Sequence, residues 1–457
     1  MTRRSIVMAA CVLLAACGGG SKEPRLNQPH IVMVTSDTLR ADHLSIFGYP
    51  RATSPSLDEF AVRSWHFTDA VTVIPKTGPS FVTLLTGWHS VQHGVRSNFE
   101  AIPEGLPVLP EWLKSGGYAT AAFVGNPVLR EGIGFSRGFD VYRLFDGKRD
   151  EGVQSVNQAF FEWADEHDWG RPTFVWIHYM DPHGPYTPAA ELEQPFLEDD
   201  LAQSDLRVPL EPGTLPSENP NKVLGAIPVY QQRDGEDRAA VYVARYDAEI
   251  LYMDTAFGEL TAFLEERDLY DGAAVIFTSD HGESLGEHDL WFEHGWFAYE
   301  PTLHVPLMIK KPGQTTGRVV RQQVSNLDLM PTILKLARGG LHGNYAGTNI
   351  LTYLEERGPV LIESSDRYPD KYHGVRTSGW KYLVREADGA EELYDLGADP
   401  AEMTNLAERE LARLEEMRQA CIEALTHARK LSIAPASGAP DDPETLERLK
   451  ALGYVGR

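Results

Sequence analysis

The stretch His-Ile-Val-Met-Val-Thr-Ser-Asp, residues 30–37, decides the fold class of this 457-residue chain. An apolar run with β-branched residues that ends at a carboxylate is typical of a strand buried in a parallel sheet. Similar runs occur at 119–124, 173–178 and 273–278, and helix-like stretches such as 110–114 and 246–267 lie between them. The sequence therefore predicts an α/β fold with a doubly wound, mostly parallel sheet. Its ligand site should lie at the carboxyl ends of the strands.

The character of the chain changes near residue 358. Residues 375–384 and 392–396 predict antiparallel strands, and 407–430 predict a charged amphipathic helix. We therefore expect a principal domain over 29–357, and a small C-terminal α+β subdomain and tail over 358–457. Residues 190–238 are acidic, rich in Pro, Asn and Gln and poor in periodicity, which indicates a surface insertion or a lid.

The N-terminal residues are typical of a targeting segment. Arg3 and Arg4 precede an apolar stretch, too short to span a bilayer, that ends in Leu14-Ala15-Ala16-Cys17-Gly18. This ending resembles the bacterial lipobox, so residues 1–17 are predicted to be a lipoprotein signal peptide with Cys17 lipidated, followed by a flexible tether over 18–28. The protein would then be extracytoplasmic, lipid-anchored to a bacterial membrane on the periplasmic side. A plain signal peptide with an incidental cysteine is the alternative.

The overall charge restricts the partners of the protein. A net charge of −24 and an isoelectric point near 5.0 argue against nucleic acid and anionic lipid surfaces. An anionic ester substrate would need local positive charge, which a metal ion and histidines can supply. The cysteines are Cys11, Cys17 and Cys421, so the mature chain has no internal pair for a disulfide. The sequence carries no signature of an oligomeric state.

Thr77 stands in the run Ile74-Pro75-Lys76-Thr77-Gly78-Pro79-Ser80-Phe81. Its hydroxyl lies before a Gly-Pro turn at the start of a predicted helix, whose N–H groups can receive an anion. The segment resembles the signature of the sulfatases, within the alkaline phosphatase superfamily, where a Cys or Ser at this position is oxidised to formylglycine. Thr77 cannot give that aldehyde, because it carries a β-methyl group, and Phe81 replaces the signature arginine. The resemblance covers nearly everything after residue 29 and implies a sulfatase-like catalytic domain over 29–357.

The resemblance also implies a divalent-metal site made by Asp37, Thr77, Asp280 and His281. Taken singly, an Asp at a strand end also fits a helix cap, and Asp-His-Gly fits a turn. Sulfatases usually have a second Asp ligand after the first and Asp-Asn in the later pair, whereas this chain has Thr38 and His281. That variant resembles the phosphonate monoester hydrolases and lipoteichoic acid synthases of the superfamily. Asp and His ligands suit Zn²⁺ or Mn²⁺, and the family's all-oxygen sites favour Ca²⁺.

Substrate contacts are implied at Asn98, His183 and His294. Asn98 lies twenty-one residues after Thr77, where superfamily phosphodiesterases place an amide donor, and a loop Asn capping a turn is the alternative. His183 and His294 match positions where the family places substrate-contacting His or Lys side chains. The family's strand-end Lys is absent, because the run reads Gly125-Asn126-Pro127, and this favours a less charged substrate.

Several nearby residues have a structural interpretation as well as a functional one. His288 fits a role in the site as well as it fits a hydrogen-bonded structural position. Arg40 and Asp42 are predicted to form an ion pair that orients the metal loop. Three aromatic residues fit either a substrate wall or the core: Trp291, Trp296 and Tyr299.

Together these parts predict a metal-dependent hydrolase that cleaves phosphate or phosphonate esters, diesters included, through a covalent Thr77 intermediate. A sulfated Thr77 would have to be released by water attacking sulfur, the step that formylglycine avoids. A phosphorylated threonine can be opened by in-line water, or by an acceptor alcohol, at a metal site. The alternatives are a sulfuric ester hydrolase that works without formylglycine, and a binding protein of the same fold that has lost turnover.

Overall fold

The computed structural model describes residues 28–146, 152–210, 224–337, 345–352, 357–365, 371–430 and 436–437, together with residues 443 and 449. Its centre is an eight-stranded sheet, parallel except for β11, which runs antiparallel to both neighbours. The α/β prediction is confirmed, because the four predicted strands are β1, β5, β7 and β8. In spatial order the strands are β12 (Arg318–Val320), β2 (Trp65–Phe67), β11 (Leu307–Lys310), β8 (Ala274–Ser279), β1 (Ile31–Ser36), β7 (Thr173–Tyr179), β5 (Ala119–Val124) and β6 (Val141–Leu144).

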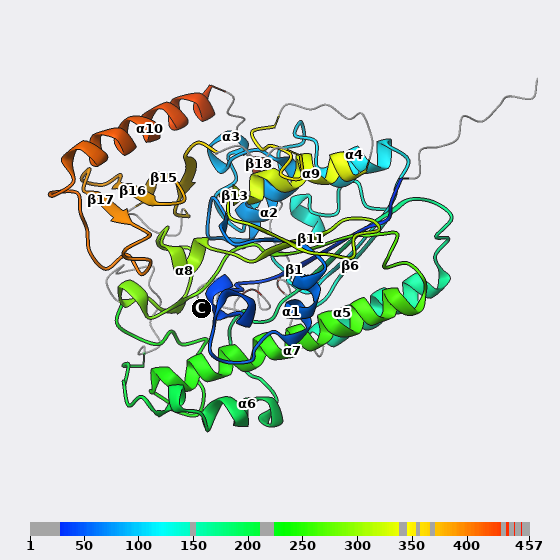
Figure 1. Ribbon diagram of the computed structural model, residues 1–457, viewed down its shortest axis with the longest axis horizontal. Coiled ribbons are helices and arrows are strands. Elements are labelled where there is room, and N and C mark those ends of the chain that lie inside the picture. Colours follow the sequence, from blue (N-terminus) through cyan, green and yellow to red (C-terminus); the bar gives the residue numbers. More distant parts are fainter. Residues whose placement is uncertain are drawn as a thin grey trace, which may run out of the picture.

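Helices cover both faces of this sheet (Figure 1). Side chains alternate between the faces along each strand, so Met33 lies in one hydrophobic cluster while Val32 lies in the other. The predicted helix 246–267 is the C-terminal part of the longer α7. One face carries α2 (Thr77–Thr86), α4 (Leu109–Ser115) and α9 (Leu329–Leu336), and the other carries α1 (Pro55–Val62), α5 (Val153–Glu166) and α7 (Ala239–Glu266).

The register of the central strands places the candidate site. β1 lies between β7 and β8, and its last residue, Ser36, pairs with Tyr179 and with Ser279. The three strands are parallel and end together, so the residues that follow them emerge at one edge of the sheet. Asp37 and Asp280 are those residues on β1 and β8, as the sequence predicts.

The C-terminal subdomain has an antiparallel sheet and one long helix. The predicted strand stretch 375–384 contains parts of two strands, because a turn at Thr377–Gly379 divides it. The predicted helix begins at Leu411 rather than at residue 407, since the Ala407 N–H donates to Asn405 Oδ1 at 2.9 Å in a turn. The domain boundary between 357 and 358 remains a prediction. The elements are β14 (Val360–Glu363), β15 (Tyr372–Arg376), β16 (Trp380–Arg385), β17 (Glu391–Asp395) and α10 (Leu411–Arg429).

The insertion over 190–238 is more ordered than its composition predicts. It contains α6 (Ala190–Leu197), which packs along α7, and Glu193 pairs with Arg245 there at 2.8 Å. Val208 and Ile227 are buried in the hydrophobic cluster on the α7 side of the sheet. Contacts with α7 thus order a sequence with little periodicity of its own, and the surface insertion stays a prediction. Residues 211–223 lie outside the described part of the chain, and the lid remains a prediction.

The N-terminal predictions fall outside the structural description. Residues 1–27, which include the predicted signal peptide, Cys17 and most of the predicted tether, are not among the described residues. Of the helices that are described, none combines the length and the apolar character needed to cross a membrane. Cys421 is a free, buried cysteine on α10.

Asp247 on α7 anchors the loop that follows β1. Its fully buried carboxylate accepts hydrogen bonds from His43 Nδ1 at 2.7 Å, from the Tyr49 hydroxyl at 2.6 Å and from the Arg51 guanidinium at 2.6 Å. Arg51 also pairs with Asp199 of the insertion at 2.5 Å. The cluster thus joins the loop after β1, helix α7 and the insertion.

Replacing Asp247 by Ala should lower the free energy of unfolding by about 3–5 kcal/mol, because it removes one partner of a buried ion pair. Urea denaturation followed by circular dichroism measures the change. The control is Asp237→Ala, which removes an exposed pair with Arg207 and should cost less than about 1 kcal/mol. Equal losses in the two variants would show that the buried cluster is not an anchor.

Candidate active site

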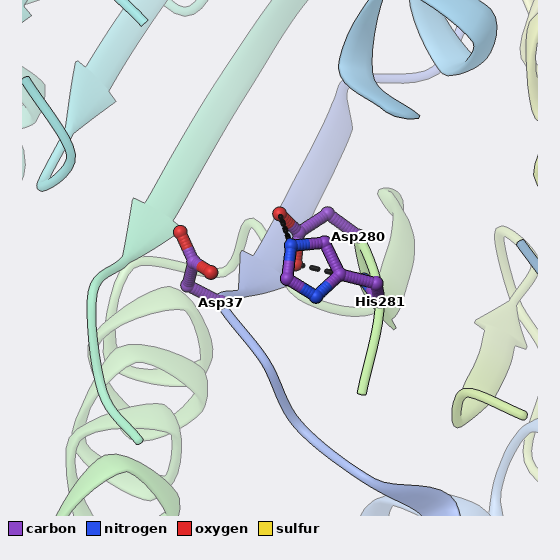
Figure 2. Close-up of side chains that lie close together, drawn as sticks. All are labelled: Asp37, Asp280 and His281. Atoms are coloured by element: carbon purple, nitrogen blue, oxygen red, sulfur yellow. Dashed lines mark hydrogen bonds and ion pairs between the residues drawn. The ribbon is translucent and has the colours of Figure 1, made fainter. Parts of the chain in front are cut away.

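Three buried side chains meet at the carboxyl ends of β1 and β8 (Figure 2). They are Asp37, Asp280 and His281, and one ligand atom of each lies within 4.8 Å of the others. Asp37 Oδ1 and Asp280 Oδ2 are buried and accept no hydrogen bond from a described residue. A buried carboxylate oxygen without a donor is costly unless a cation binds it. This donor set therefore fits one divalent metal ion.

The two carboxylates repel each other. Burial and the charge of Asp37 raise the pKa of Asp280 well above its ordinary value. Burial alone would also raise the pKa of Asp37, but a hydrogen bond with His178 and the charges of His183 and His178 lower it to about 2. Asp37 is therefore ionised at neutral pH, and a cation bound between the two carboxylates would favour ionisation of Asp280 as well.

His281 presents the nitrogen atom that a metal ion requires. Its Nδ1 lies 2.8 Å from the Gly282 carbonyl oxygen, which can only accept, so Nδ1 carries the proton. The lone pair on Nε2 then lies 3.3 Å from Thr77 Oγ1 and 3.4 Å from Asp280 Oδ2. Burial lowers the pKa of His281 to about 4, so the imidazole is neutral. Tautomer and charge both suit a metal ligand.

Thr77 is the first residue of α2, and its side chain is fully buried. One helical turn later, Ser80 Oγ donates to the carbonyl oxygen of Asp280 at 2.7 Å. Asn326 Nδ2 donates in turn to Ser80 Oγ at 3.0 Å. These bonds tie the N-terminus of α2 to the loop after β8. The Thr77 hydroxyl is thus held beside His281 at a helix end that favours an anion.

Asn98 lies against the same helix end. Its Oδ1 accepts a hydrogen bond from the Gly78 N–H at 2.8 Å, which orients the amide. A Cβ atom at Gly78 would lie 3.0 Å from that oxygen, so glycine permits the close approach. Asn98 Nδ2 is buried and donates to no described residue. Asn98 therefore caps α2, the alternative left open by the sequence, while a second polar atom stays available to a substrate oxygen.

His183 and His294 lie with His281 in one cluster of imidazoles. The ring centroids of His281 and His294 are 4.5 Å apart, and those of His183 and His294 are 5.1 Å apart. His183 Nδ1 donates to the Gly184 carbonyl oxygen at 2.6 Å, and His294 Nδ1 is hydrogen-bonded to Glu283 Oε1 at 3.0 Å. Glu283 is itself buried and fixes the orientation of the His294 ring. The structure thus brings all the sequence-predicted catalytic and metal-site residues into one region.

Two residues that hold Asp37 were not predicted as part of the site. Asn126 Nδ2 donates to Asp37 Oδ2 at 2.5 Å, and His178 Nε2 lies 3.5 Å from the same oxygen. Asn126 follows β5 and His178 lies near the end of β7, the strands beyond β1 on one side of the sheet. Polar residues at strand ends were the available signal. From the sequence, Asn126 was interpreted only as the position of a missing lysine.

Lys76 and Phe81 complete the surroundings of Thr77. Lys76 is buried, and its positive charge contributes to the low pKa of His281, behind the larger effect of burial. Phe81 packs against Trp176 and His178, with ring centroids 5.0 and 4.9 Å apart. An arginine at position 81 would place its charge in this buried aromatic cluster. The signature cation is therefore replaced by packing, while Lys76 provides a positive charge one residue before Thr77.

The loop after β1 shows the predicted ion pair. Arg40 Nη2 lies 2.7 Å from Asp42 Oδ2, and Arg40 Nη1 lies 2.8 Å from Glu287 Oε1. Thr38 stands where the family's second Asp ligand is expected. Its backbone N–H donates to Asp280 Oδ1 at 3.2 Å, and its hydroxyl makes no hydrogen bond with a described residue. Arg40 therefore links the loops after β1 and β8.

The structure favours structural roles for His288 and two of the aromatic residues. His288 stacks on Tyr299 with ring centroids 3.6 Å apart, away from the three-residue metal cluster. Tyr299 and Trp296 are buried and pack in hydrophobic clusters, whereas Trp291 is only partly buried. The core interpretation therefore holds for Tyr299 and Trp296.

The mostly parallel sheet carries a candidate metal site, and the Thr77 hydroxyl lies beside it at the N-terminus of α2. This arrangement is that of a sulfatase-type hydrolase. The family model described as "Sulfatase" matches residues 29–340, and one described as "N-sulphoglucosamine sulphohydrolase, C-terminal" matches residues 286–430. The chain belongs to the sulfatase family, whose members hydrolyse ester bonds. The two matches overlap, so they leave the domain boundary open.

Similar proteins include sulfatases and a phosphonate monoester hydrolase. Choline-sulfatase of Rhizobium meliloti is 27% identical over 433 residues, which cover 83% of each chain. A protein solved in complex with its substrate D-glucosamine-2-N,6-O-disulfate has a TM-score of 0.73 and 21% identity, over 88% of this chain and 98% of that chain. The phosphonate monoester hydrolase of Agrobacterium radiobacter has a TM-score of 0.70 and 21% identity, over 90% and 100%. At these identities the two structural matches show the fold alone.

Replacing His281 by Asn should shift metal preference from Zn²⁺ and Mn²⁺ toward Ca²⁺, because it exchanges an imidazole nitrogen for an amide oxygen. Protein dialysed against each ion and analysed by plasma mass spectrometry reports the bound metal. His288→Asn is the matched control and should bind metal as the wild type does. An unchanged metal content and preference in His281→Asn would exclude His281 as a ligand.

Proposed function

We propose that this sulfatase-family hydrolase cleaves phosphate or phosphonate esters, diesters included, through a covalent Thr77 intermediate and with one divalent metal ion. The observation that carries the proposal is the position of Thr77 Oγ1, buried at the N-terminus of α2 and 3.3 Å from His281 Nε2. A threonine cannot become formylglycine. Cys421 cannot supply one at this site either, because it lies on α10, in a hydrophobic cluster of the C-terminal subdomain. The Thr77 hydroxyl itself is therefore the nucleophile in this proposal.

Each group around Thr77 has a separate role in the first half of the reaction, the formation of the Thr77 ester. A divalent ion held by Asp37, Asp280 and His281 would lower the pKa of the Thr77 hydroxyl and neutralise charge on the ester. Thr77 Oγ1 attacks phosphorus, and the bond between phosphorus and the leaving alcohol breaks. Asn98 Nδ2 donates to one non-bridging oxygen, while His183 and His294 stabilise charge on the other oxygens.

The second half returns the enzyme to its starting state and favours phosphorus over sulfur. Water attacks the phosphorus of the Thr77 ester in line, the Oγ1–phosphorus bond breaks, and the threonine hydroxyl is restored. The corresponding sulfated threonine would require water to attack sulfur. Phe81 and Asn126 stand where the family has cations, which reduces positive charge around the substrate. That reduction supports a singly charged diester or phosphonate monoester.

Sulfuric esters are the second candidate substrate class. The support comes from relatives, since the choline-sulfatase match covers 83% of this chain. The third hypothesis is that the chain is a catalytically inactive binding protein. It is disfavoured because the hydroxyl and the three candidate ligands are all present and close together.

Replacing Thr77 by Ala should lower kcat by more than about 10³-fold, since losing a covalent nucleophile costs more than losing one oxyanion donor. Thr77→Ser should retain activity, because only the methyl group is lost. Rates are measured on p-nitrophenyl phosphate, bis-p-nitrophenyl phosphate, p-nitrophenyl phenylphosphonate and p-nitrophenyl sulfate. Wild-type enzyme quenched during turnover of the diester should carry phosphate on the Thr77 peptide by mass spectrometry.

The matched control is Thr86→Ala at the other end of α2, which removes a hydrogen bond to the Val82 carbonyl and one from the Trp88 N–H, both away from the site. It should remain active. Near-normal rates for Thr77→Ala would support the binding-protein reading or another nucleophile. Turnover of the sulfate ester alone would establish the sulfuric ester alternative.

We also propose that Cys17 anchors the protein to a membrane on the extracytoplasmic side. The support is the lipobox-like sequence Leu14-Ala15-Ala16-Cys17. Two acyl chains on a diacylglyceryl cysteine suffice for stable attachment. Cys17→Ser should leave the protein unprocessed or move it from the membrane fraction to the soluble fraction, as measured by fractionation and immunoblotting. A mature N-terminus at any residue other than Cys17 would contradict the proposal.

A further inference from the structure

A cleft of about 990 Å³ lies where the principal sheet meets the C-terminal subdomain. The residues that follow the edge strand β12 line one side. The tip of the β15–β16 hairpin and the first half of α10 line the other. None of the residues of the Thr77 centre belongs to the lining. A volume of this size is typical of a site for a small molecule or for part of a larger one.

The lining is rich in arginine, although the whole chain carries a net charge of −24. Arg413 lies over the Trp380 ring, 5.1 Å from its centroid, and forms an exposed ion pair with Glu416 at 2.6 Å. Arg357 pairs with Asp328. Arg321 is exposed and makes no hydrogen bond or ion pair with any other residue that the structure describes. Among the described residues of the lining, Glu416 is the one carboxylate.

The hairpin tip adds neutral donors to these charges. Thr377 and Trp380 close the turn, through a hydrogen bond from Thr377 N to Trp380 O at 2.8 Å and one from Trp380 N to Thr377 Oγ1 at 3.0 Å. Ser378 and Gly379 lie between them, and their backbone N–H groups donate to no residue in the described ranges. Guanidinium groups and backbone N–H groups are the donors that phosphate and sulfate oxygens accept from in proteins.

The lining residues that follow β12 lie at the same edge of the sheet as the candidate active site. β12 is parallel to β2, and β2 and β8 are both antiparallel to β11, so all three of β12, β2 and β8 run in the same direction. The residues after β12 therefore emerge at the edge where Asp280 follows β8. Three inter-strand spacings separate β12 from β8, or roughly 14 Å. Beyond the cleft the chain continues to Asn326, which bonds Ser80 of the nucleophile helix.

We propose that this cleft binds a second tetrahedral oxyanion group, a phosphate or a sulfate, of an extended anionic substrate whose scissile ester lies at Thr77. The recognition would come from Arg321 and the N–H groups of the hairpin tip, which have no partner among the described residues, together with Arg413. The placement of both sites on one edge of the sheet lets a single molecule reach them. The link to the substrate rests on the proposed function, whereas anion binding in the cleft does not.

Titration calorimetry of the metal-loaded enzyme with a short inorganic polyphosphate tests the proposal at low ionic strength. Arg321→Ala should weaken binding several-fold, and the double variant with Arg413→Ala should weaken it by more than about 10-fold, a loss of roughly 1.4 kcal/mol. Arg409→Ala removes an exposed arginine outside the lining and should bind as the wild type does. All variants should hydrolyse the small p-nitrophenyl esters at the wild-type rate, which separates this test from that of Thr77.

Each outcome supports or overturns the proposal. Wild-type binding by Arg321→Ala and by the double variant would exclude an anion site in the cleft. A titration with single phosphate and single sulfate ions identifies the source of the bound group. If single ions bind as tightly as the chain and are lost in the same variants, the cleft binds free ions and the extended-substrate proposal is overturned.

Discussion

The structure depends on one electrostatic conflict, the approach of two buried carboxylates at the ends of adjacent parallel strands. β1 and β8 pair in register, so Asp37 and Asp280 emerge side by side, and both are fully buried. Burial and the charge of Asp37 raise the pKa of Asp280, which measures how unfavourable the pair is without a cation. A divalent cation held between the two carboxylates would relieve this repulsion, and the neutral imidazole of His281 completes a donor set that fits one.

The other contacts of the site position the Thr77 hydroxyl beside the two carboxylates, Asp37 and Asp280. Ser80 fixes α2 to the loop after β8, and Asn98 caps the same helix end. These hydrogen bonds hold the N-terminus of α2 in place, so Thr77 lies beside His281. Preorganisation of this kind is what an electrostatic mechanism requires, since no group has to reorient as charge develops. Phe81 in place of the signature arginine leaves this part of the site without that positive charge, and its ring packs against Trp176 and His178.

The sequence predicted those features that depend on local pattern. The run 119–124 coincides with β5, and polar residues at strand ends identified Asp37 and Asp280. The contacts of Asn126 and His178 with Asp37 depend on the spatial order β1-β7-β5, which periodicity does not specify. The helix in the insertion was missed because α7, distant in sequence, stabilises it. The turn that divides 375–384 did have a local signal in Ser378-Gly379, but it lies inside a run of strand-forming residues.

The distribution of charge also limits which substrates the protein can take. A chain with a net charge of −24 repels an anionic ester at long range, so positive charge has to be concentrated where the substrate binds. Lys76 and a divalent ion held by the candidate ligands would provide it at Thr77, and the arginines of the cleft would provide it at the C-terminal subdomain. A small dianion would gain from the first location alone. An extended anion that spans both would gain from both, which is the physical basis of the proposed two-site binding.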